Sequence, residues 1–565
     1  MNTQLPKITR PERSELLMPA GSVENMKAAV LYGADAIYAG TPDMSLRTKS
    51  SFSLEQLVEG IEFAHARGVR VYLTLNIFSH NKDVEKLPVF IETIRKVKPD
   101  GVIIADPAVF QFVKDNAPEL ELHVSTQANI CSWMSVKYWQ DQGASLCVLA
   151  REVSFGELEE IREKCPEIKL EAFVHGAMCM TYSGRCLLSN FMAERGANQG
   201  SCAHSCRWKY KVHIKLRDGK TEELEINEDN MHMFEFLLEE GCRPGQMMPI
   251  EEDIDGSYIL NSKDLCLMPK LDDYLRIGVD SLKVEGRHKN AYYVSIVARS
   301  YRRAIDDYYA DPENWDPKPY MKELETIRNR GYTLAFHEGR LTDQSHDYET
   351  TASLGDWSYG GFVRAWDGDT MVFELRNMME TGDVLEFLPP GSLEAIRIRL
   401  YAFEVEKTRE TVEKVSAGQG QAIRIPLSAF HAEDAATLKD MLVPGTVARA
   451  ETSDLAVAKS ARVKVRIQSH QTEYGKVGQK VYEGTKKRVE EKMRAEGKGI
   501  AADKQKPKTK EEACCGRGCN GCLVFWNDPK YARARDILAE KKMGERLAQK
   551  VIMPEELKQA EADNA

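Results

Sequence analysis

The sequence predicts an α/β fold in which the first half of the chain forms a (β/α)8 TIM-like barrel. Three observations support this prediction: eight short apolar runs, amphipathic segments between most of them, and a Gly that ends each of the first helical patterns. Strand and helix in alternation indicate a parallel sheet, and eight strands suggest that the sheet closes. A doubly wound sheet is the alternative, and it would keep the same loops at the carboxyl edge of the strands.

The predicted strands are short apolar runs, which read in order "ELLMPAG", "ADAIYAG", "RVYLTLNIF", "DGVIIAD", "LELHVSTQA", "SLCVLARE", "LEAFVHG" and "DSLKVEGR". Helices are expected over 22–33 and 53–68, where apolar residues recur at three- and four-residue spacing. The seventh strand ends near Gly176 and the eighth begins near Asp280, an interval of about a hundred residues where a few dozen suffice for a crossover. A large insertion therefore follows strand seven.

The rest of the chain changes character several times. From about residue 355, short alternating strands separated by Gly, Pro and Asp predict a small antiparallel β-barrel. Residues 476–510 hold 12 Lys plus Arg against 5 Asp plus Glu, which is typical of a solvated linker. The predicted domains are the barrel (14–310) with its Cys-rich insertion (176–270), a helical or irregular connector (311–354), the small β-barrel (355–470), a basic linker (471–512), and a Cys-rich motif with a C-terminal helix (513–565).

Composition restricts the class of protein. With 42% hydrophobic and 29% charged residues, the chain is expected to be soluble and globular, and no stretch approaches the ~18 apolar residues of a membrane span. A cytoplasmic location is therefore expected. Thiols stay reduced there, so thirteen cysteines favour metal or redox chemistry over disulfides. The net charge of −10 argues against a surface that binds nucleic acid everywhere, although a local basic patch is compatible with it.

Four cysteines gather at the start of the insertion, where loops after barrel strands build active sites. Cys179, Cys186, Cys202 and Cys206 lie within 28 residues among several glycines, which predicts a metal site. Zinc ligands are usually paired two to four residues apart, whereas six residues separate Cys179 from Cys186, so an iron-sulfur cluster is favoured. A cysteine nucleophile with His175 or His204 as its base is a third interpretation.

A second group of cysteines lies near the end of the chain in "ACCGRGCNGC". Its members, Cys514, Cys515, Cys519 and Cys522, predict another metal site, for which zinc and an iron-sulfur cluster are equally compatible.

Polar residues stand where the predicted barrel strands end. Asn76, Gln127 and His175 end strands three, five and seven, and polar residues at this edge of a barrel are typical of an active site. Arg151 follows strand six. Lys283, Glu285 and Arg287 follow strand eight, where Glu285 is expected either to orient the cations or to act as an acid or base. The structural alternatives are that Glu285 simply pairs with Arg287 and that the other polar residues cap loops.

A longer pattern surrounds the first cysteines. The spacing of Glu171, Phe173, Gly176, Cys179, Gly184, Cys186 and Ser189 resembles the signature of the collagenase-like peptidase family U32, whose catalytic type is unassigned. The resemblance extends over residues 14–310, through "MPAGSVENMKAAVLYGADAIYAG", "HVSTQANI", "NSKDLC" and "SLKVEGRHKNAYYV", and continues into the small barrel. Within that family, "GANQGSCAHSCRWKY" and "YILNSKDL" are most similar to the bacterial prephenate-dependent tRNA uridine hydroxylases.

The resemblance implies an enzyme that converts the wobble uridine of tRNA to 5-hydroxyuridine without molecular oxygen. It implies a 4Fe-4S cluster, prephenate as co-substrate, tRNA as partner and an electron donor that the sequence does not identify. Cys179, Cys186 and Cys202 match the cluster ligands of the family. Cys206 fits the tRNA branch as the fourth ligand, Cys242 fits the ubiquinone branch, and Cys266 is a weaker candidate.

Binding residues follow from these expected substrates. Prephenate carries two carboxylates, for which Arg287, Lys283 and Arg151 are the candidate partners. Arg207 and Lys209, interleaved with Trp208 and Tyr210, are candidates for RNA contacts, although a core position for Trp208 is the structural alternative. The competing functions are a collagenase-like peptidase, a hydroxylase of ribosomal RNA or of a ubiquinone precursor, and a non-catalytic metal-containing RNA-binding protein. The sequence lacks the HExxH and GxSxG peptidase motifs.

Overall fold

The computed structural model describes residues 13–41, 45, 52–179, 181–193, 195, 197–199, 202–207, 262–339, 357–401, 403–418, 420–430 and 435–451, together with short strands between 214 and 257. The basic linker predicted over 471–512 and the tail predicted over 513–565, with Cys514, Cys515, Cys519 and Cys522, lie outside these residues. So do Lys209 and Cys242 of the insertion.

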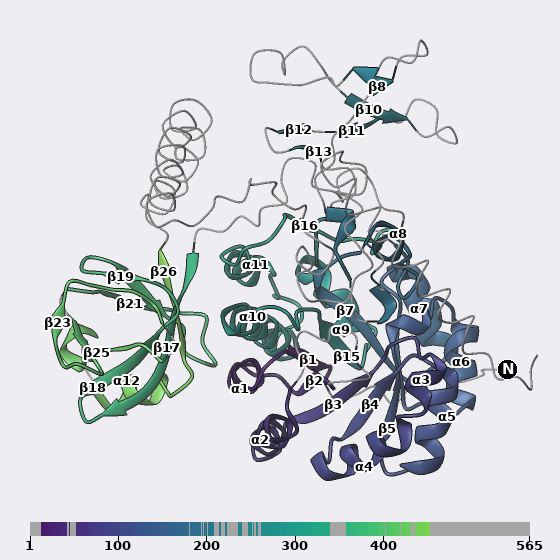
Figure 1. The fold of residues 1–565 in the computed structure, drawn as a ribbon, viewed down its shortest axis with the longest axis horizontal. Coiled ribbons are helices and arrows are strands. Elements are labelled where there is room, and N and C mark those ends of the chain that lie inside the picture. Colours follow the sequence, from purple (N-terminus) through teal and green to yellow (C-terminus); the bar gives the residue numbers. More distant parts are fainter. Residues whose placement is uncertain are drawn as a thin grey trace, which may run out of the picture. The chain divides into compact units, whose positions relative to one another are not determined.

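Parallel strands close into a barrel, as the sequence predicts (Figure 1). The eight strands are β1 (Glu15–Ala20), β2 (Ala36–Gly40), β3 (Arg70–Leu75), β4 (Gly101–Ile104), β5 (Glu121–Val124), β6 (Leu146–Val148), β7 (Lys169–Ala177) and β15 (Ser281–Val284). Neighbours follow the order of the chain, and β15 pairs with both β1 and β7. Ser281 lies opposite Glu15 on one side and Glu171 on the other, which closes the sheet.

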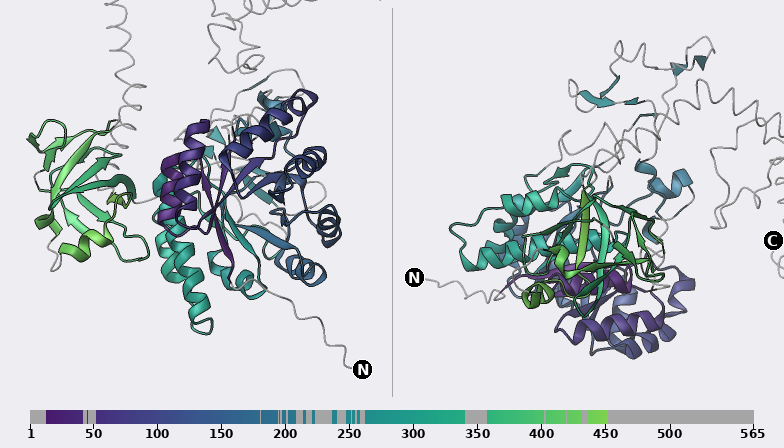
Figure 2. Two further views of the ribbon diagram at one scale, coloured as in Figure 1. Left: turned by 90° about the horizontal axis from the view of Figure 1, so that it is seen from below. Right: turned by 90° about the vertical axis from the view of Figure 1, so that its left-hand side faces the viewer.

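Helices surround the strands (Figure 2). They are α1 (Val23–Leu31), α2 (Leu54–His65), α3 (Asn81–Val84), α4 (Leu87–Val97), α5 (Pro107–Asn116), α6 (Trp133–Asp141), α7 (Phe155–Lys164), α9 (Leu271–Arg276) and α10 (Ala291–Ala310). Ser22 and Ser53 cap the first two helices, each accepting a hydrogen bond from a backbone N–H of the first turn. Gly33 and Gly68 follow these helices with positive φ, so the predicted ends are confirmed.

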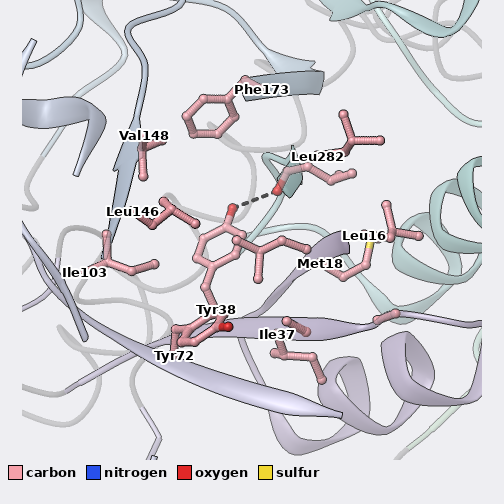
Figure 3. Close-up of a cluster of buried hydrophobic side chains, with 14 of the residues drawn as sticks. Leu16, Met18, Ile37, Tyr38, Tyr72, Ile103, Leu146, Val148, Phe173 and Leu282 are labelled. Atoms are coloured by element: carbon pink, nitrogen blue, oxygen red, sulfur yellow. Dashed lines mark hydrogen bonds between the residues drawn. The ribbon is translucent and has the colours of Figure 1, made fainter. Parts of the chain in front are cut away.

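The barrel core draws buried side chains from strands all around the sheet (Figure 3). Tyr38, Tyr72 and Phe173 supply the aromatic part of this core, and the Tyr38 hydroxyl donates to the Val284 carbonyl oxygen at 2.8 Å. A strand buried on both faces reads as a continuous apolar run, which is why the sequence locates these strands well.

The insertion after β7 begins with α8 (Leu188–Ala193) and two single turns, η3 (Ala197–Gln199) and η4 (Ser205–Arg207). Short antiparallel pairs follow: β8 (Ile214–Lys215) with β9 (Thr221–Glu222), β10 (Phe236–Glu239) with β11 (Met247–Ile250), and β12 (Glu252–Asp253) with β13 (Gly256–Ser257). The chain then returns to the barrel as β14 (Asp264–Cys266), which pairs antiparallel with β7 and parallel with β16 (Tyr332–Thr333). The sequence does not predict this extension of the sheet.

The second domain is an antiparallel β structure, as predicted. Its strands are β17 (Trp357–Asp367), β18 (Thr370–Leu375), β20 (Val384–Phe387), β21 (Ile396–Arg399), β22 (Phe403–Val405), β23 (Thr411–Val412), β25 (Ala422–Pro426) and β26 (Val447–Glu451), in the order β21-β20-β26-β17-β18-β25-β22-β23. The smaller elements are β19 (Met379–Glu380), β24 (Lys414–Val415), η8 (Leu427–Phe430) and α12 (Ala435–Met441). The domain has its own core, which includes Phe373 and Phe387.

One buried hydroxyl joins the small domain to the barrel. Tyr32, at the end of α1, donates to the Leu388 carbonyl oxygen at 2.6 Å and accepts from the Val447 N–H at 2.9 Å. Leu388 and Val447 pack into the barrel core rather than into the core of their own domain. The helix α11 (Lys318–Leu324) lies in the connector, and Glu323 at its end pairs with Arg449 of β26 at 3.2 Å. Within the described residues, no helix is long and apolar enough to cross a membrane.

Candidate active site at the carboxyl end of the barrel

Asn76 and Gln127 lie where β3 and β5 end, as the sequence predicts. Asn76 follows β3 directly, and its side-chain amide donates to the Ser125 hydroxyl at 3.4 Å. The same hydroxyl accepts the backbone N–H of Gln127, which lies in the turn η2 (Thr126–Ala128), at 3.2 Å. Ser125 thus links the ends of two strands, and its contribution was not predicted from the sequence.

Arg287 follows β15 and is buried at the same end of the barrel. Its guanidinium donates to the hydroxyls of Ser45 at 2.6 Å and Thr74 at 2.9 Å. The guanidinium carbon lies 5.7 Å from the centre of the Tyr38 ring. A guanidinium held by two hydroxyls and an aromatic ring is fixed in place, and its positive charge is not cancelled by these neighbours.

Arg151 follows β6 and is paired with Glu285, which follows β15. Their closest nitrogen and oxygen are 3.5 Å apart, and both side chains are more than four-fifths buried. Arg151 also stacks on the Phe173 ring at 3.9 Å. The buried Nε of Arg151 has no hydrogen-bond partner among the described residues. The structural alternative expected from the sequence was a pair between Glu285 and Arg287. The structure shows an ion pair between Glu285 and Arg151.

Lys283 lies inside the barrel, within β15, whereas the sequence placed it after the strand. Its ammonium contacts Glu171 Oε1 at 2.7 Å and lies 4.4 Å from the centre of the Tyr38 ring. The two side chains are 5% and 0% exposed, so the pair is fully withdrawn from water. The pairing of Glu171 with this lysine was not predicted from the sequence. A carboxylate inside an otherwise apolar strand was the signal, because it needs a buried partner.

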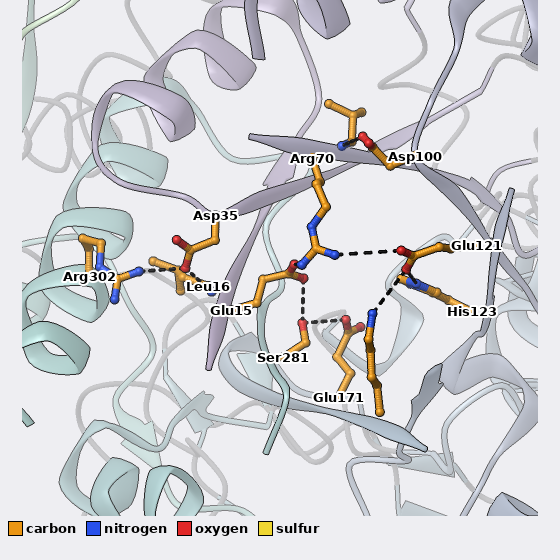
Figure 4. Close-up of polar contacts among 12 residues, drawn as sticks. Glu15, Leu16, Asp35, Arg70, Asp100, Glu121, His123, Glu171, Ser281 and Arg302 are labelled. Atoms are coloured by element: carbon orange, nitrogen blue, oxygen red, sulfur yellow. Dashed lines mark hydrogen bonds and ion pairs between the residues drawn. The ribbon is translucent and has the colours of Figure 1, made fainter. Parts of the chain in front are cut away.

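A further polar network occupies the amino end of the barrel (Figure 4). Ser281 donates to Glu171 at 2.8 Å and lies 3.3 Å from Glu15, which contacts the Arg70 guanidinium. Burial raises the pKa of Glu15 to about 7, against the opposing effect of Arg70. His123 completes this layer and is buried, with its Nε2 atom 3.2 Å from the carboxylate of Glu121.

His175 occupies a different environment from the other predicted site residues. The register between β7 and β15 shifts at Val284, and the imidazole packs among Tyr293 and Tyr301 of α10 and Tyr332 of β16, outside the barrel. Burial lowers its pKa to about 3, so the ring is neutral. These surroundings are those of a core histidine, and its catalytic role stays a prediction.

Hydrogen bonds through Asn198 connect the cysteine loop to the barrel. The Phe78 N–H donates to the Asn198 carbonyl oxygen at 3.0 Å, and the Asn198 amide donates to the Cys186 carbonyl oxygen at 3.2 Å. Gly184 has a φ of +73°, and a Cβ at this position would collide with the Gln127 carbonyl oxygen. Only glycine fits here, and the contact sets the loop against the end of β5.

The structure describes four cysteines of this loop. Cys179 is exposed, and Cys186, Cys202 and Cys206 are half-buried. His204 adopts a φ of 56°, and its N–H donates to the Cys202 sulfur at 3.4 Å. A hydrogen bond of this kind stabilises the thiolate form that metals bind. Cys266 differs, because burial raises its pKa to about 12 and its sulfur lies 3.6 Å from that of Met321.

The donor chemistry of the loop fits thiolate ligation. Among the described residues, no three His, Cys, Asp or Glu side chains converge as ligands of one metal ion. A four-iron cluster is held by four thiolates that lie around a larger group than a single ion. The four cysteines of the loop and the N–H donated to Cys202 are therefore compatible with a cluster. Arg207 ends the turn η4, and the structure describes only its backbone.

Comparisons with known proteins agree on one family. The model described as Peptidase family U32 matches residues 21–347. The tRNA hydroxylation protein P of Escherichia coli (strain K12) is 39% identical over 408 residues, which cover 67% of this chain and 86% of that protein. The tRNA hydroxylation protein P1 of Bacillus subtilis (strain 168) is 35% identical over 72% of this chain and 87% of that protein. The Collagenase of Porphyromonas gingivalis (strain ATCC BAA-308 / W83) is 30% identical over 60% of this chain and 77% of that protein.

Proposed function

Because this chain belongs to peptidase family U32 and is 39% identical to a protein named for tRNA hydroxylation, we propose that it is an enzyme that hydroxylates uridine in tRNA. The proposed reaction is the oxygen-independent conversion of the wobble uridine to 5-hydroxyuridine, with prephenate as co-substrate. The observation that carries the proposal is the extent of the match, which covers 86% of that relative rather than one shared domain.

Prephenate is a dianion, so its site needs fixed cations. Arg287 and Arg151 are both buried beside aromatic rings at the carboxyl end of the barrel, where barrel enzymes bind their substrates. Guanidinium groups hold carboxylates in two-point contacts, and the Arg151 Nε has no partner among the described residues. We assign one carboxylate to each arginine. Lys283 contributes less to binding, because Glu171 already accepts its hydrogen bond at 2.7 Å.

The uracil base needs a proton acceptor and an orienting surface. Glu285 is a carboxylate at this end of the barrel, and Arg151 lies 3.5 Å from it. We assign Glu285 the role of acid or base for the bound substrates, with Arg151 holding its carboxylate in place. Asn76 and Gln127, linked through Ser125, are assigned to the polar edge of the base.

A 4Fe-4S cluster is the redox group that we propose for the cysteine loop. Cys179, Cys186 and Cys202 would hold it, with Cys206 or Cys242 as the fourth thiolate. The position of these cysteines at the barrel end and the N–H donated to Cys202 support this set. Such a cluster supplies one-electron transfer beside the bound substrates.

Nucleoside mass spectrometry of tRNA from a deletion strain tests the function. We expect 5-hydroxyuridine and its derivatives to disappear, and wild-type protein to restore them. Cys179→Ser should fail to restore them, whereas Cys165→Ser, which alters a buried thiol at the C-terminal cap of α7, should succeed. Unchanged modification in a strain without paralogues would contradict the proposal.

The Collagenase relative gives the peptidase alternative a specific basis. Purified protein can be incubated with gelatin while new amino termini are counted, and the same deletion strain provides ribosomal RNA for nucleoside analysis. Elemental analysis after anaerobic purification should find about four iron atoms per protein molecule for each cluster, rather than stoichiometric zinc. Proteolysis that survives Cys179→Ser, with normal tRNA, would favour the peptidase.

A further inference from the structure

The small β domain carries a hollow of about 260 Å³ that belongs to no part of the candidate active site. Leu400 and Tyr401, which follow β21, line this hollow. The strand β21 is at one edge of the sheet, and the next strand in the chain, β22, is near the other edge. In the described part of the domain, β21 pairs with β20 alone. The two edges therefore approach each other without joining, and the hollow lies between them.

The floor of this hollow is apolar and its rim is aromatic. Leu400, Phe403 and Ile425 line it and are buried members of the domain core. Tyr401 is 69% exposed, although an aromatic ring of this size normally gains free energy by being buried. An exposed ring above an apolar floor offers a stacking surface to a flat ligand.

The charge at the rim is positive. Arg399 is the one charged side chain among the described residues that line the hollow. It donates to the Gly382 carbonyl oxygen at 3.0 Å, and no described carboxylate pairs with it. Arg397, two residues earlier on the same face of β21, pairs with Glu386 at 3.8 Å, so the positive charge at the hollow comes from Arg399. This arrangement fits an anionic ligand that also presents a flat ring.

We propose that the hollow binds an unpaired base of an RNA strand, with Tyr401 stacked on the base and Arg399 in contact with a neighbouring phosphate. Proteins that bind single-stranded RNA combine aromatic platforms with arginines in this way. A volume of about 260 Å³ lies just below the range of ~300–1,000 Å³ typical of small-molecule sites, which suits one base rather than a whole cofactor. The inference rests on the proposed function, because that function makes tRNA the ligand.

Binding of an unmodified tRNA transcript to the full chain, measured at several salt concentrations, tests this inference. Tyr401→Ala should weaken binding by about 5- to 100-fold, and Tyr401→Phe should retain it, because stacking needs the ring and not the hydroxyl. Arg399→Ala should weaken binding and reduce the slope of log K against log salt by about one.

Matched controls are an exposed tyrosine and an exposed arginine elsewhere. Tyr138 on α6 is 54% exposed, and Arg409 is an exposed arginine of the same domain that pairs with Glu404. Tyr138→Ala and Arg409→Ala should bind tRNA as the wild type does. If Tyr401→Ala and Arg399→Ala also bind as the controls do, the hollow is not an RNA site, and capture of an acidic peptide there would identify a protein-docking surface instead.

The steady-state kinetics separate this inference from the proposed function. Tyr401→Ala should raise KM for tRNA and leave kcat unchanged at saturating tRNA, because the ring lies outside the barrel. Hydroxylation with an unchanged KM would overturn the inference and leave the function intact. Binding of tRNA that depends on Tyr401, in a protein that hydroxylates nothing, would overturn the function and support the inference.

Discussion

The two ends of the barrel carry the same kinds of charged side chain in different arrangements. At the amino end, Glu15 contacts both Arg70 and Ser281, and the buried Nδ1 of His123 in the same layer has no partner among the described residues. At the carboxyl end, Arg151 pairs with Glu285, Arg287 is held by hydroxyls, and the Arg151 Nε has no partner among the described residues. The amino end pairs its buried carboxylate with a cation, which can contribute to stability, whereas the carboxyl end places two arginines beside aromatic rings, which suits an anionic ligand. The same types of charged residue therefore indicate different roles, according to the partners that surround their side chains.

The largest expected effect comes from the ion pair between these two ends. Lys283→Met should lower the free energy of unfolding by about 3–5 kcal/mol, because it leaves the fully buried Glu171 without its cation. Denaturant titration measures this change. The double variant Lys283→Met with Glu171→Gln should recover most of the loss, since no buried charge is then left unpaired. A single variant as stable as the wild type would show that Glu171 is not charged in the fold.

The second prediction concerns pH and the amino end. Burial raises the pKa of the Glu15 carboxyl from 4.5 to about 7, so the folded protein binds this proton more tightly than the unfolded chain does. Stability should therefore fall as pH rises from about 4.5 to about 7, by about 3 kcal/mol from this group, and change little above that range.

Glu15→Gln isolates the contribution of this carboxyl. The variant cannot lose the proton, so the difference in unfolding free energy between it and the wild type should grow from pH 4.5 to pH 7. A difference that stays constant across this range would mean that Glu15 keeps an ordinary pKa and that the amino end is not closed to water.

The third prediction compares one arginine from each end. Arg287→Ala should lower kcat/KM for the anionic co-substrate by about 10- to 100-fold, the effect of losing a hydrogen bond to a charged group. Arg70→Ala, at the opposite end, should leave kcat/KM unchanged. Arg287→Lys should stay impaired, because an ammonium cannot reproduce the two-point contact. Equal losses in the two alanine variants would remove the functional distinction between the ends.

The smallest effect is expected at the glycine that fixes the cysteine loop. Gly184→Ala should cost about 1–3 kcal/mol, because a side chain is strained at a φ of +73° and its Cβ would also meet the Gln127 carbonyl oxygen. Gly68 is a matched control with the same φ and open space around it, so Gly68→Ala should cost about 1 kcal/mol. Thermal denaturation compares the two, and equal costs would show that the loop does not rest on the end of β5.

The barrel fold could be predicted from the sequence because its strands are buried on both faces. Leu16 and Leu17 at one strand, and Ile103 and Ile104 at another, are all buried, so the runs that contain them read as continuous apolar segments. The strand β14 escaped prediction because it is three residues long and its pairing with β7 depends on residues almost ninety positions earlier in the chain. A pattern confined to one short window does not contain that pairing.

Only part of the candidate active site could be predicted from the sequence. Residues that follow strands, such as Asn76 and Arg287, lie at the predicted end of the barrel. Lys283 was placed wrongly, because its position inside the barrel depends on closure between β7 and β15 and on Glu171, 112 residues away. His175 is turned out of the barrel by a register shift that alternation along the strand does not reveal. The local sequence determines which strand a residue follows. The direction of its side chain depends on pairing between strands that are far apart in the chain.

The hydroxyl of Tyr32 has a consequence for how the molecule comes apart. It satisfies a backbone N–H and a backbone carbonyl of the small domain at once, both buried in the barrel core. Separating the domains would break both hydrogen bonds, at a net cost of about 0.5–1.5 kcal/mol for each, and would expose the apolar surface around them to water. The barrel and the β domain should therefore melt in one cooperative transition, and a protease should find no intermediate in which one has opened while the other persists.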